Sequence, residues 1–202
     1  ALVLSDESLS RWHNVALWYL KNITETVEYF QQWYYNAEYG GYYVFQDEGF
    51  ATAPGVNVPF NWNNAMGSVL LALYDATQNE GYLAQAKALA ETFKTHLDIA
   101  PNGSYRWHYW FGDGFELNKS TEDVSHATID IHFAISCMEH GIVFSDDDIK
   151  CFSITLKENV WNGQEFTSSV WGTGDVSPQI ADAGIVWVPL GMYDKKILTI
   201  IK

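Results

Sequence analysis

The sequence predicts an all-α fold, an α/α helical-hairpin array with short extended segments between the hairpins, on two observations. Segments that combine a glycine with aromatic residues recur about every 60 residues, at 41–45, 103–107 and 163–166. Between them, apolar residues recur at the three- and four-residue steps of helices that bury one face. Because stacked hairpins build a curved array, we expect an incomplete α/α toroid or a small α/α barrel.

The 202 residues suit a single domain with a substantial core. We divide the domain into hairpin units at about 5–45, 62–107 and 122–166, with the start of a fourth unit at 180–194. Three units and a start fall short of a closed ring. The rest of a toroid could come from a homo-oligomer or from a further portion of the chain.

The first unit is the most aromatic and the least regular. We expect one helix over residues 5–21 and a second over 24–35, ending before Gly40 and Gly41. In the second unit, the apolar stripes over 66–74 and 83–97 predict two helices joined around residues 78–81.

The third unit repeats this pattern. Gly141 is a natural stop for its first helix, and Ser145 is a natural cap for its second, with three aspartates facing the positive helix end. In the fourth unit, Pro189 allows only a kinked or broken helix over residues 180–193.

The chain carries 25 acidic and 11 basic residues, a net charge of −14. This balance argues against binding to nucleic acid or to an anionic membrane surface, since both reward clustered Lys and Arg. No apolar stretch approaches the roughly 18 residues of a membrane span. Cys137 and Cys151 flank a short turn between two helices and could form a disulfide, which would favour an extracellular or periplasmic location; two buried thiols are the alternative.

Aromatic residues make up 16% of the chain, and many lie next to Asn, Asp, His or Gly. Tyr and Trp pair a flat apolar face with a hydrogen-bonding edge, which suits the recognition of sugars and also builds ordinary cores. If the repeats stack in register, the three connections that follow the glycine-aromatic segments open on one end of the array, where function concentrates.

The first connection ends in Asn63 and Asn64, which could cap the following helix or present neutral amides to a substrate. The second runs through Arg106, Trp107, His108, Tyr109 and Trp110 to Glu122, Asp123, His126 and Asp130. On a helix, the last three would share one face, where a carboxylate can fix the tautomer of an imidazole and raise its basicity. The alternative is that Ser120 or Thr121 caps the helix and the acidic residues serve its dipole.

The third connection offers Trp171 and Asp175 between glycines that allow a ligand to approach the backbone closely. We expect no metal and no cofactor, because paired Cys-x-x-Cys motifs, His-x-x-x-His spacing and a phosphate-binding loop are absent from the sequence.

The sequence resembles the α/α-toroid proteins that act on glycans, including polysaccharide lyases and the C-terminal domain of D-glucuronyl C5-epimerases. The resemblance covers roughly residues 41–170 and lies in the repeated hairpins, the turn at 73–82 and the aromatic, Asn and His connections. It implies an oligo- or polysaccharide partner and a base that removes the C5 proton of a uronic acid. His126 or Tyr109 would be this base.

The same resemblance implies that Asn64 and Arg106 neutralise the sugar carboxylate. Trp107, Trp110 and Trp171 would be stacking platforms. Two other functions stay open. One is glycoside hydrolysis by two carboxylates, with Glu122 or Asp123 facing Asp175; the other is a non-catalytic module that binds glycans through the same aromatic face.

Overall fold

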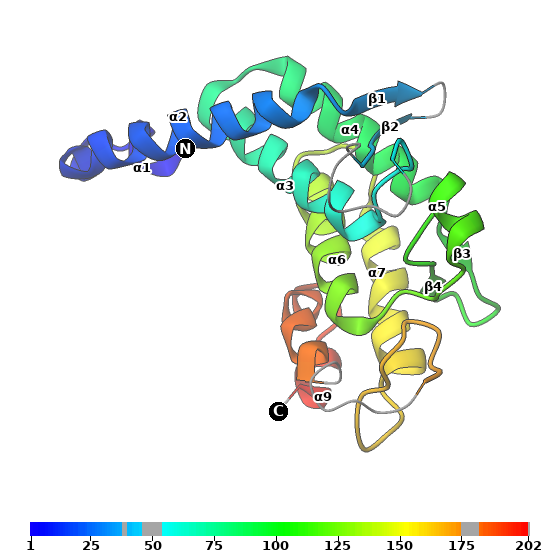
Figure 1. Ribbon diagram of the computed structural model, residues 1–202. Coiled ribbons are helices and arrows are strands. Elements are labelled where there is room, and N and C mark those ends of the chain that lie inside the picture. The colour runs from blue at the N-terminus through cyan, green and yellow to red at the C-terminus, as the bar shows by residue number, and fades with distance from the viewer. Residues whose placement is uncertain (38–39, 46–53, 175–181, 202) are drawn as a thin grey trace.

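The computed structural model describes residues 1–37, 40–45, 54–174 and 182–201. It is mostly helical, with two small antiparallel sheets of two strands each, which agrees with the predicted all-α class at this coarse level (Figure 1). The elements are α1 (Leu2–Ser5), η1 (Glu7–Trp12), α2 (His13–Gln31), β1 (Tyr34–Ala37), β2 (Gly40–Tyr43), α3 (Phe60–Thr77), α4 (Glu80–Thr95), β3 (Asp98–Ile99), β4 (Tyr105–Arg106), α5 (Gly112–Leu117), α6 (Val124–Glu139), α7 (Asp146–Ile154), η2 (Thr155–Val160), η3 (Asp182–Met192) and α9 (Ile197–Ile200).

The helices α3, α4, α6 and α7 surround an apolar core, and α3 contacts both α4 and α6. The approach of α3 to α6 is close, because a Cβ added at Gly67 would lie 2.4 Å from the ring of Phe133. Any larger residue at position 67 would push the two helices apart. This contact fixes α3 against α6 one turn away from Asn64.

The turns between these helices confirm the predicted boundaries. Gln78 ends α3 in the left-handed conformation at φ 57°, and the side chain of Asn79 caps α4. Gly141, at φ +68°, follows α6. Ser145 caps α7 in a reciprocal capping box with Asp148. The predicted turns therefore separate α3 from α4 and α6 from α7, while the arrangement of these helices as hairpins of a toroid or barrel stays a prediction.

The first predicted unit is wrong as a hairpin, since α2 continues through the predicted break at residues 22–23. Asn22 lies at the predicted break, but its side chain is accommodated within the helix, as is that of Thr26 one turn later. Asn22 Nδ2 donates to the Trp18 carbonyl at 2.6 Å, and Thr26 Oγ1 donates to the Asn22 carbonyl at 2.8 Å. The end of the second predicted helix, Tyr34 and Tyr35, instead pairs with β2 in a hairpin.

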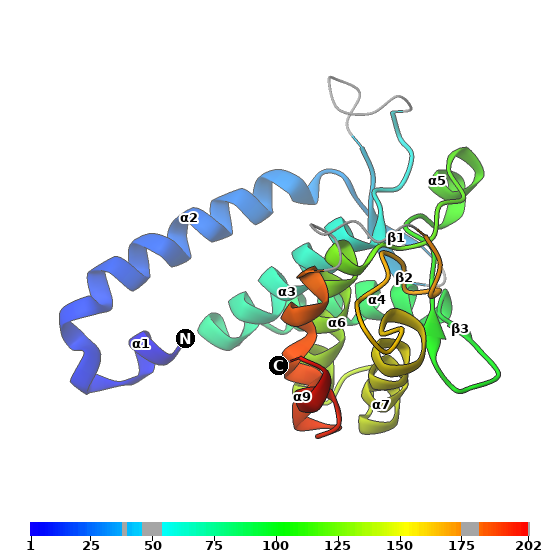
Figure 2. The same ribbon diagram turned by 90° about the horizontal axis from the view of Figure 1, so that it is seen from below.

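Helix α2 projects from the rest of the molecule, as Figure 2 shows from below. Val27 is its one buried residue among those described, whereas Leu17, Trp18 and Tyr19 are more than half exposed. At the other end of the chain, η3 contains Pro189 and forms a 3₁₀ rather than an α-helix, in line with the predicted irregularity.

Two of the glycine-aromatic segments contain short strands, in line with the prediction, whereas the third, at 163–166, is a bend rather than an extended segment. Gly41 lies in β2, Tyr105 in β4, and Phe166 forms an isolated bridge with Trp161. Cys137 and Cys151 are separate thiols, the first of them buried, so the structure contains the alternative to the disulfide. Among the described helices, none has the length and apolar character needed to cross a bilayer.

Candidate active site

Three connections meet at the start of α6, as the stacking of the repeats predicted. Phe60 N donates to the carbonyl of Tyr109 at 3.1 Å, which joins the first connection to the second. Glu122 N donates to the carbonyl of Trp107 at 3.2 Å, and the Glu122 carbonyl accepts from Val170 N at 3.1 Å. The backbone of Glu122 is thus held between the second and third connections.

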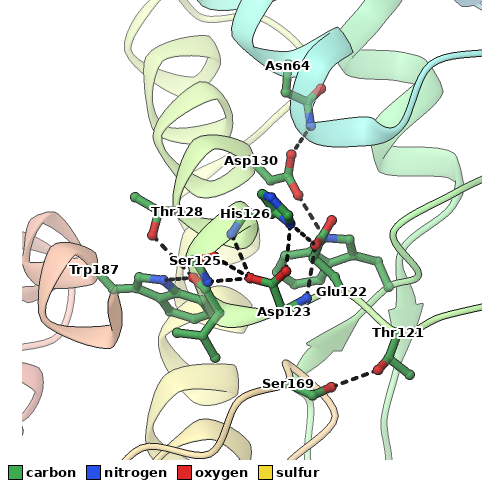
Figure 3. A network of polar contacts seen from close by, with 12 residues as sticks. Asn64, Thr121, Glu122, Asp123, Ser125, His126, Thr128, Asp130, Ser169 and Trp187 are labelled. Carbon is green, nitrogen blue, oxygen red and sulfur yellow. Dashed lines mark hydrogen bonds and ion pairs between the residues drawn. The ribbon is translucent and has the colours of Figure 1, made fainter. Parts of the chain in front are cut away.

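Asp123 serves both as the cap of α6 and as the partner of His126 (Figure 3). Its Oδ1 accepts from Ser125 N at 2.8 Å and from His126 N at 3.0 Å. Its Oδ2 lies 2.6 Å from His126 Nδ1, close enough for an ion pair although off the hydrogen-bond direction of the ring N–H. The alternative cap at Ser120 or Thr121 is therefore wrong. The predicted carboxylate–imidazole pair is present.

Behind this pair, Glu122 and Asp130 are fully buried. Asn64 Nδ2 donates to Asp130 Oδ1 at 2.7 Å (Figure 3). Trp107 Nε1 donates to Asp130 Oδ2 at 2.9 Å. Glu122 Oε1 accepts from Asp123 N at 2.9 Å, while Glu122 Oε2 is buried without a hydrogen-bond partner. Asp130 is thus well provided with donors and Glu122 is not.

Burial raises the pKa of Glu122 well above its usual value, and the charges of Asp130 and Asp123 raise it further. Burial also raises the pKa of Asp130 to about 7, although the hydrogen bonds from Asn64 and Trp107 oppose this shift. Because N–H donors favour the ionised form, we place the charge on Asp130 and the proton on Glu122 at neutral pH. Over the part of the chain that the structure describes, no Lys or Arg forms an ion pair with these carboxyl groups.

The ring of Tyr109 lies against that of His126, with 5.2 Å between the centroids and an interplanar angle of 34°. Burial raises the pKa of Tyr109, and the charges of Glu122, Asp123 and Asp130 add to this effect, while a hydrogen bond from Asn61 opposes it. The Tyr109 hydroxyl therefore keeps its proton at neutral pH. A neutral phenol beside an imidazole is suited to donate a proton while the imidazole accepts one.

A pocket of about 620 Å³ is separated from this pair by the side chain of Asn61, which is one of its lining residues. Trp33, Phe45 and Trp62 contribute aromatic walls, and Asn61 lines it as well. The Oδ1 atom of Asn61 is buried without a hydrogen-bond partner. Since Asn61 also bonds to Tyr109, this side chain connects the pocket to the proton-transfer pair.

A second group of rings lies beside the site. The guanidinium of Arg106 stacks 4.4 Å from the ring centre of Trp171, and the Trp171 ring lies 5.2 Å from His108. Trp171 Nε1 donates to the Trp107 carbonyl at 2.9 Å, which anchors this group to the second connection. Arg106 Nε is buried without a partner.

Three predicted substrate-binding residues have structural roles. Asn63 is buried and bonds to the backbone of Tyr43 and Val58, each at 2.9 Å. Asn64 is buried on Asp130, and neither Asn caps α3, which begins at residue 60. Trp107 is fully buried, so it cannot be a stacking platform. Each of these side chains bonds to a buried partner and has almost no exposed surface for a sugar.

The described residues do not contain both members of the carboxylate pair that the hydrolase alternative requires. Asp175 lies outside the described residues, and the same holds for residues 176–181. The carboxyl groups that do meet, Glu122 and Asp130, are both buried on the same side of the site. Trp110, the remaining predicted platform, is half-buried, with its ring 5.4 Å from Tyr109 and 5.8 Å from Phe45.

One cluster has the donor set of a cation site. The ligand atoms of Glu122, Asp123 and His126 lie within 4.8 Å of one another. Two carboxylates and an imidazole suit several divalent ions. A proton on Glu122 would also neutralise its buried carboxyl group, so the burial of this group does not by itself require a metal ion.

The sequence did not predict a role for Asn61 or the presence of the aromatic pocket. It placed Asp130 on the same helix face as Asp123 and His126 but did not predict its buried contacts. Asn61 stands three residues before Asn64 in the same segment, but nothing in the sequence says which amide turns towards Tyr109. Comparison with protein-family models, with curated proteins and with solved structures found no significant match. The function therefore has to be inferred from the site itself.

Proposed function

We propose that this protein is a glycan lyase that removes the C5 proton of a uronic acid residue and breaks the glycosidic bond at C4. One observation carries the proposal: Asp123 lies 2.6 Å from the imidazole of His126, and that imidazole lies against the ring of a protonated Tyr109. The site thereby provides a base and an acid side by side.

The proposed reaction is a β-elimination. Asp123 favours the tautomer of His126 with the proton on Nδ1, which leaves the lone pair on Nε2 to accept the C5 proton. The electron pair of the C5–H bond forms the C4=C5 double bond as the C4–O bond breaks. Tyr109 gives its proton to the departing oxygen and is reprotonated afterwards, and His126 loses the proton it took.

The arrangement of the two rings favours elimination over epimerisation. An epimerase must take a proton from one face of the sugar and return one to the opposite face, which requires groups on both sides. His126 and Tyr109 lie against each other and so approach a substrate from one side. This geometry matches a base and an acid that act on neighbouring atoms of one sugar face.

The C5 proton becomes acidic only when the neighbouring carboxylate is neutralised. Asn64, predicted for this role, is committed to Asp130. We assign the role to Arg106, whose guanidinium carbon lies 4.4 Å from the ring centre of Trp171 and which could form a charge-assisted contact with a carboxylate. The proton on Glu122 reduces the negative charge that an incoming uronate would meet.

For the scaffold, we propose an open portion of an α/α toroid, in which the pairs α3–α4 and α6–α7 are successive hairpins. The support is their order and the convergence of their connections at one end. The exposed apolar residues of α2, such as Trp18 and Tyr19, would be covered where the ring continues. A second copy of the chain or a further portion of it would supply that cover.

The test is the product. Incubation with a panel of polyuronates should give an unsaturated product that absorbs in the ultraviolet, and His126→Ala and Tyr109→Phe should each lower its rate by about 10²- to 10⁴-fold. The matched controls His132→Ala and Tyr19→Phe change exposed residues outside the site and should leave the rate unchanged. New reducing ends without the unsaturated product would replace the lyase by a hydrolase.

A further inference from the structure

The aromatic pocket takes no part in the proposed proton transfers, yet it adjoins the groups that carry them. We propose that it is a subsite for an uncharged pyranose ring, so that the glycan presents a neutral sugar here and its uronate at Tyr109 and His126. This inference rests on the proposed function in one respect, because the lyase proposal is what makes the neighbouring sugar a uronate. The pocket itself can be tested without turnover.

The walls of the pocket fit the apolar face of a sugar. Trp33, Phe45 and Trp62 lie among its lining residues, and the rings of Phe45 and Trp62 are 5.4 Å apart. The ring C–H groups of a pyranose form a flat apolar face that packs on such rings, while its hydroxyl groups remain at the edge. A pocket of about 620 Å³ has room for a group of this size.

Asn61 gives the pocket a polar contact that a purely apolar ligand would not satisfy. The residue is 4% exposed, its amide donates to Tyr109, and its Oδ1 is buried without a partner. A buried acceptor without a donor costs free energy, so a ligand that supplies a donor is favoured there. A sugar hydroxyl is such a donor, and it would lie one side chain away from Tyr109.

The charge of the lining decides which sugar fits. Among the described residues that line the pocket, none is Lys, Arg, Asp or Glu. A uronate carboxylate would therefore be desolvated here without a counter-charge, which is unfavourable. A neutral ring meets no such penalty.

A continuous series of ring contacts joins the pocket to the proton-transfer pair. Trp62 contacts Phe45, Phe45 contacts Trp110 at 5.8 Å, and Trp110 contacts Tyr109 at 5.4 Å. Tyr109 in turn stacks on His126. Adjacent rings of one glycan could thus occupy the pocket and the reacting position together.

The experiment measures binding and turnover separately. Calorimetric titration uses cellotetraose, mannotetraose and maltotetraose as neutral probes and tetragalacturonate as the charged probe. At least one neutral tetrasaccharide should bind. Trp62→Ala should weaken that binding roughly tenfold and Asn61→Leu roughly fivefold, because each removes one contact of the subsite. Trp18→Ala, a change at an exposed Trp of α2 outside the pocket, is the matched control and should bind normally.

The outcomes distinguish the subsite from the proposed lyase. If no neutral probe binds, or if Trp62→Ala and Asn61→Leu bind as the unsubstituted protein does, the neutral-sugar subsite is wrong even if polyuronates are cleaved. If neutral probes bind through these residues and no polyuronate is cleaved, the subsite stands and the lyase fails. Binding of tetragalacturonate alone would also overturn the subsite. Equal urea midpoints for the variants and the unsubstituted protein would show that lost binding is not lost folding.

Discussion

Two buried carboxyl sites in this protein have opposite electrostatics. Asp148 accepts hydrogen bonds from Lys94 at 2.7 Å, from the Tyr105 hydroxyl at 2.5 Å and from Ser145 Oγ at 2.6 Å. Burial raises the pKa of Asp148, but these partners outweigh burial and hold the pKa at about 2. Glu122 and Asp130, buried without a cation among the described residues, have raised pKa values instead.

The difference shows which site was built for stability. Around Asp148, the Lys94 ammonium and the hydroxyl groups of Tyr105 and Ser145 join the ends of α4 and α7 through one ionised group. The Glu122–Asp130 site instead keeps two carboxyl groups together at a cost to folding, next to His126 and Tyr109. Carboxyl groups with strongly raised pKa values, located beside a pocket, are typical of functional sites.

The largest effect on stability is expected at Asp148. Asp148→Ala leaves the Tyr105 hydroxyl, Lys94 and the backbone N–H of Ser145 without their acceptor, and should lower the free energy of unfolding by about 3 kcal/mol. Solvent reaches Lys94, which keeps the loss below that of a fully buried pair. Urea unfolding measures this change. A loss below about 1 kcal/mol would mean that the hydrogen bonds of Asp148 do not stabilise the fold.

The pH dependence of stability should have opposite signs at the two sites. The folded-state pKa of Asp148 is lowered from 3.8 to about 2, so its contribution of about 2 kcal/mol is present above pH 4 and is lost as pH falls towards 2. The folded-state pKa of Asp130 is raised from 3.8 to about 7, so this site costs stability progressively as pH rises from 4 to 7.

Urea midpoints measured from pH 3 to pH 8 would separate the two contributions. Asp148→Asn should flatten the acid limb and leave the neutral limb. Asp130→Asn should leave the acid limb and make the neutral limb shallower without removing it, because burial also raises the pKa of Glu122. An unchanged neutral limb in Asp130→Asn would assign that limb to other groups, of which His140 is one because its pKa is raised beside Asp75.

A smaller effect is expected at Glu122. Glu122→Gln replaces a protonated carboxyl group by a neutral amide of similar shape, so the free energy of unfolding at pH 7 should change by no more than about 1 kcal/mol. The infrared band of a protonated carboxylic acid, present in the unsubstituted protein at pH 7, should weaken in the variant. If Glu122→Gln leaves this band intact, the proton resides elsewhere.

The two sites also show what sequence patterns can predict. Ser145 and Asp148 form a local capping box, so sequence spacing alone located that part of the Asp148 site. The helix ends at residues 78–81 and at Gly141 could likewise be predicted from residues that are close in the sequence. Helix α2 was misjudged because side-chain bonds to the backbone of the preceding turn kept polar residues inside the helix.

The candidate site depended more on contacts between distant segments. The spacing of Asp123 and His126 on one helix was sufficient to predict their contact. The role of Asn64 was not, because its partner Asp130 lies 66 positions away and is reached only where α3 packs closely on α6. Trp107 was misassigned for the same reason, since its burial follows from packing that no local pattern records.

The smallest effect is expected from removing metal ions. This experiment tests whether a proton or a cation offsets the negative charge around Glu122. Glu122, Asp123 and His126 could hold a divalent cation, but a proton on Glu122 and the contact between Asp123 and His126 already balance the cluster. EDTA should therefore leave the melting temperature and the rate of product formation unchanged. A bound ion at 100 times its dissociation constant would stabilise the fold by about 2.7 kcal/mol, so titration with Zn²⁺, Mn²⁺ and Ca²⁺ gives a clear alternative. A rise of that size, abolished in Asp123→Asn, would make the cluster a cation site and remove His126 from the role of base.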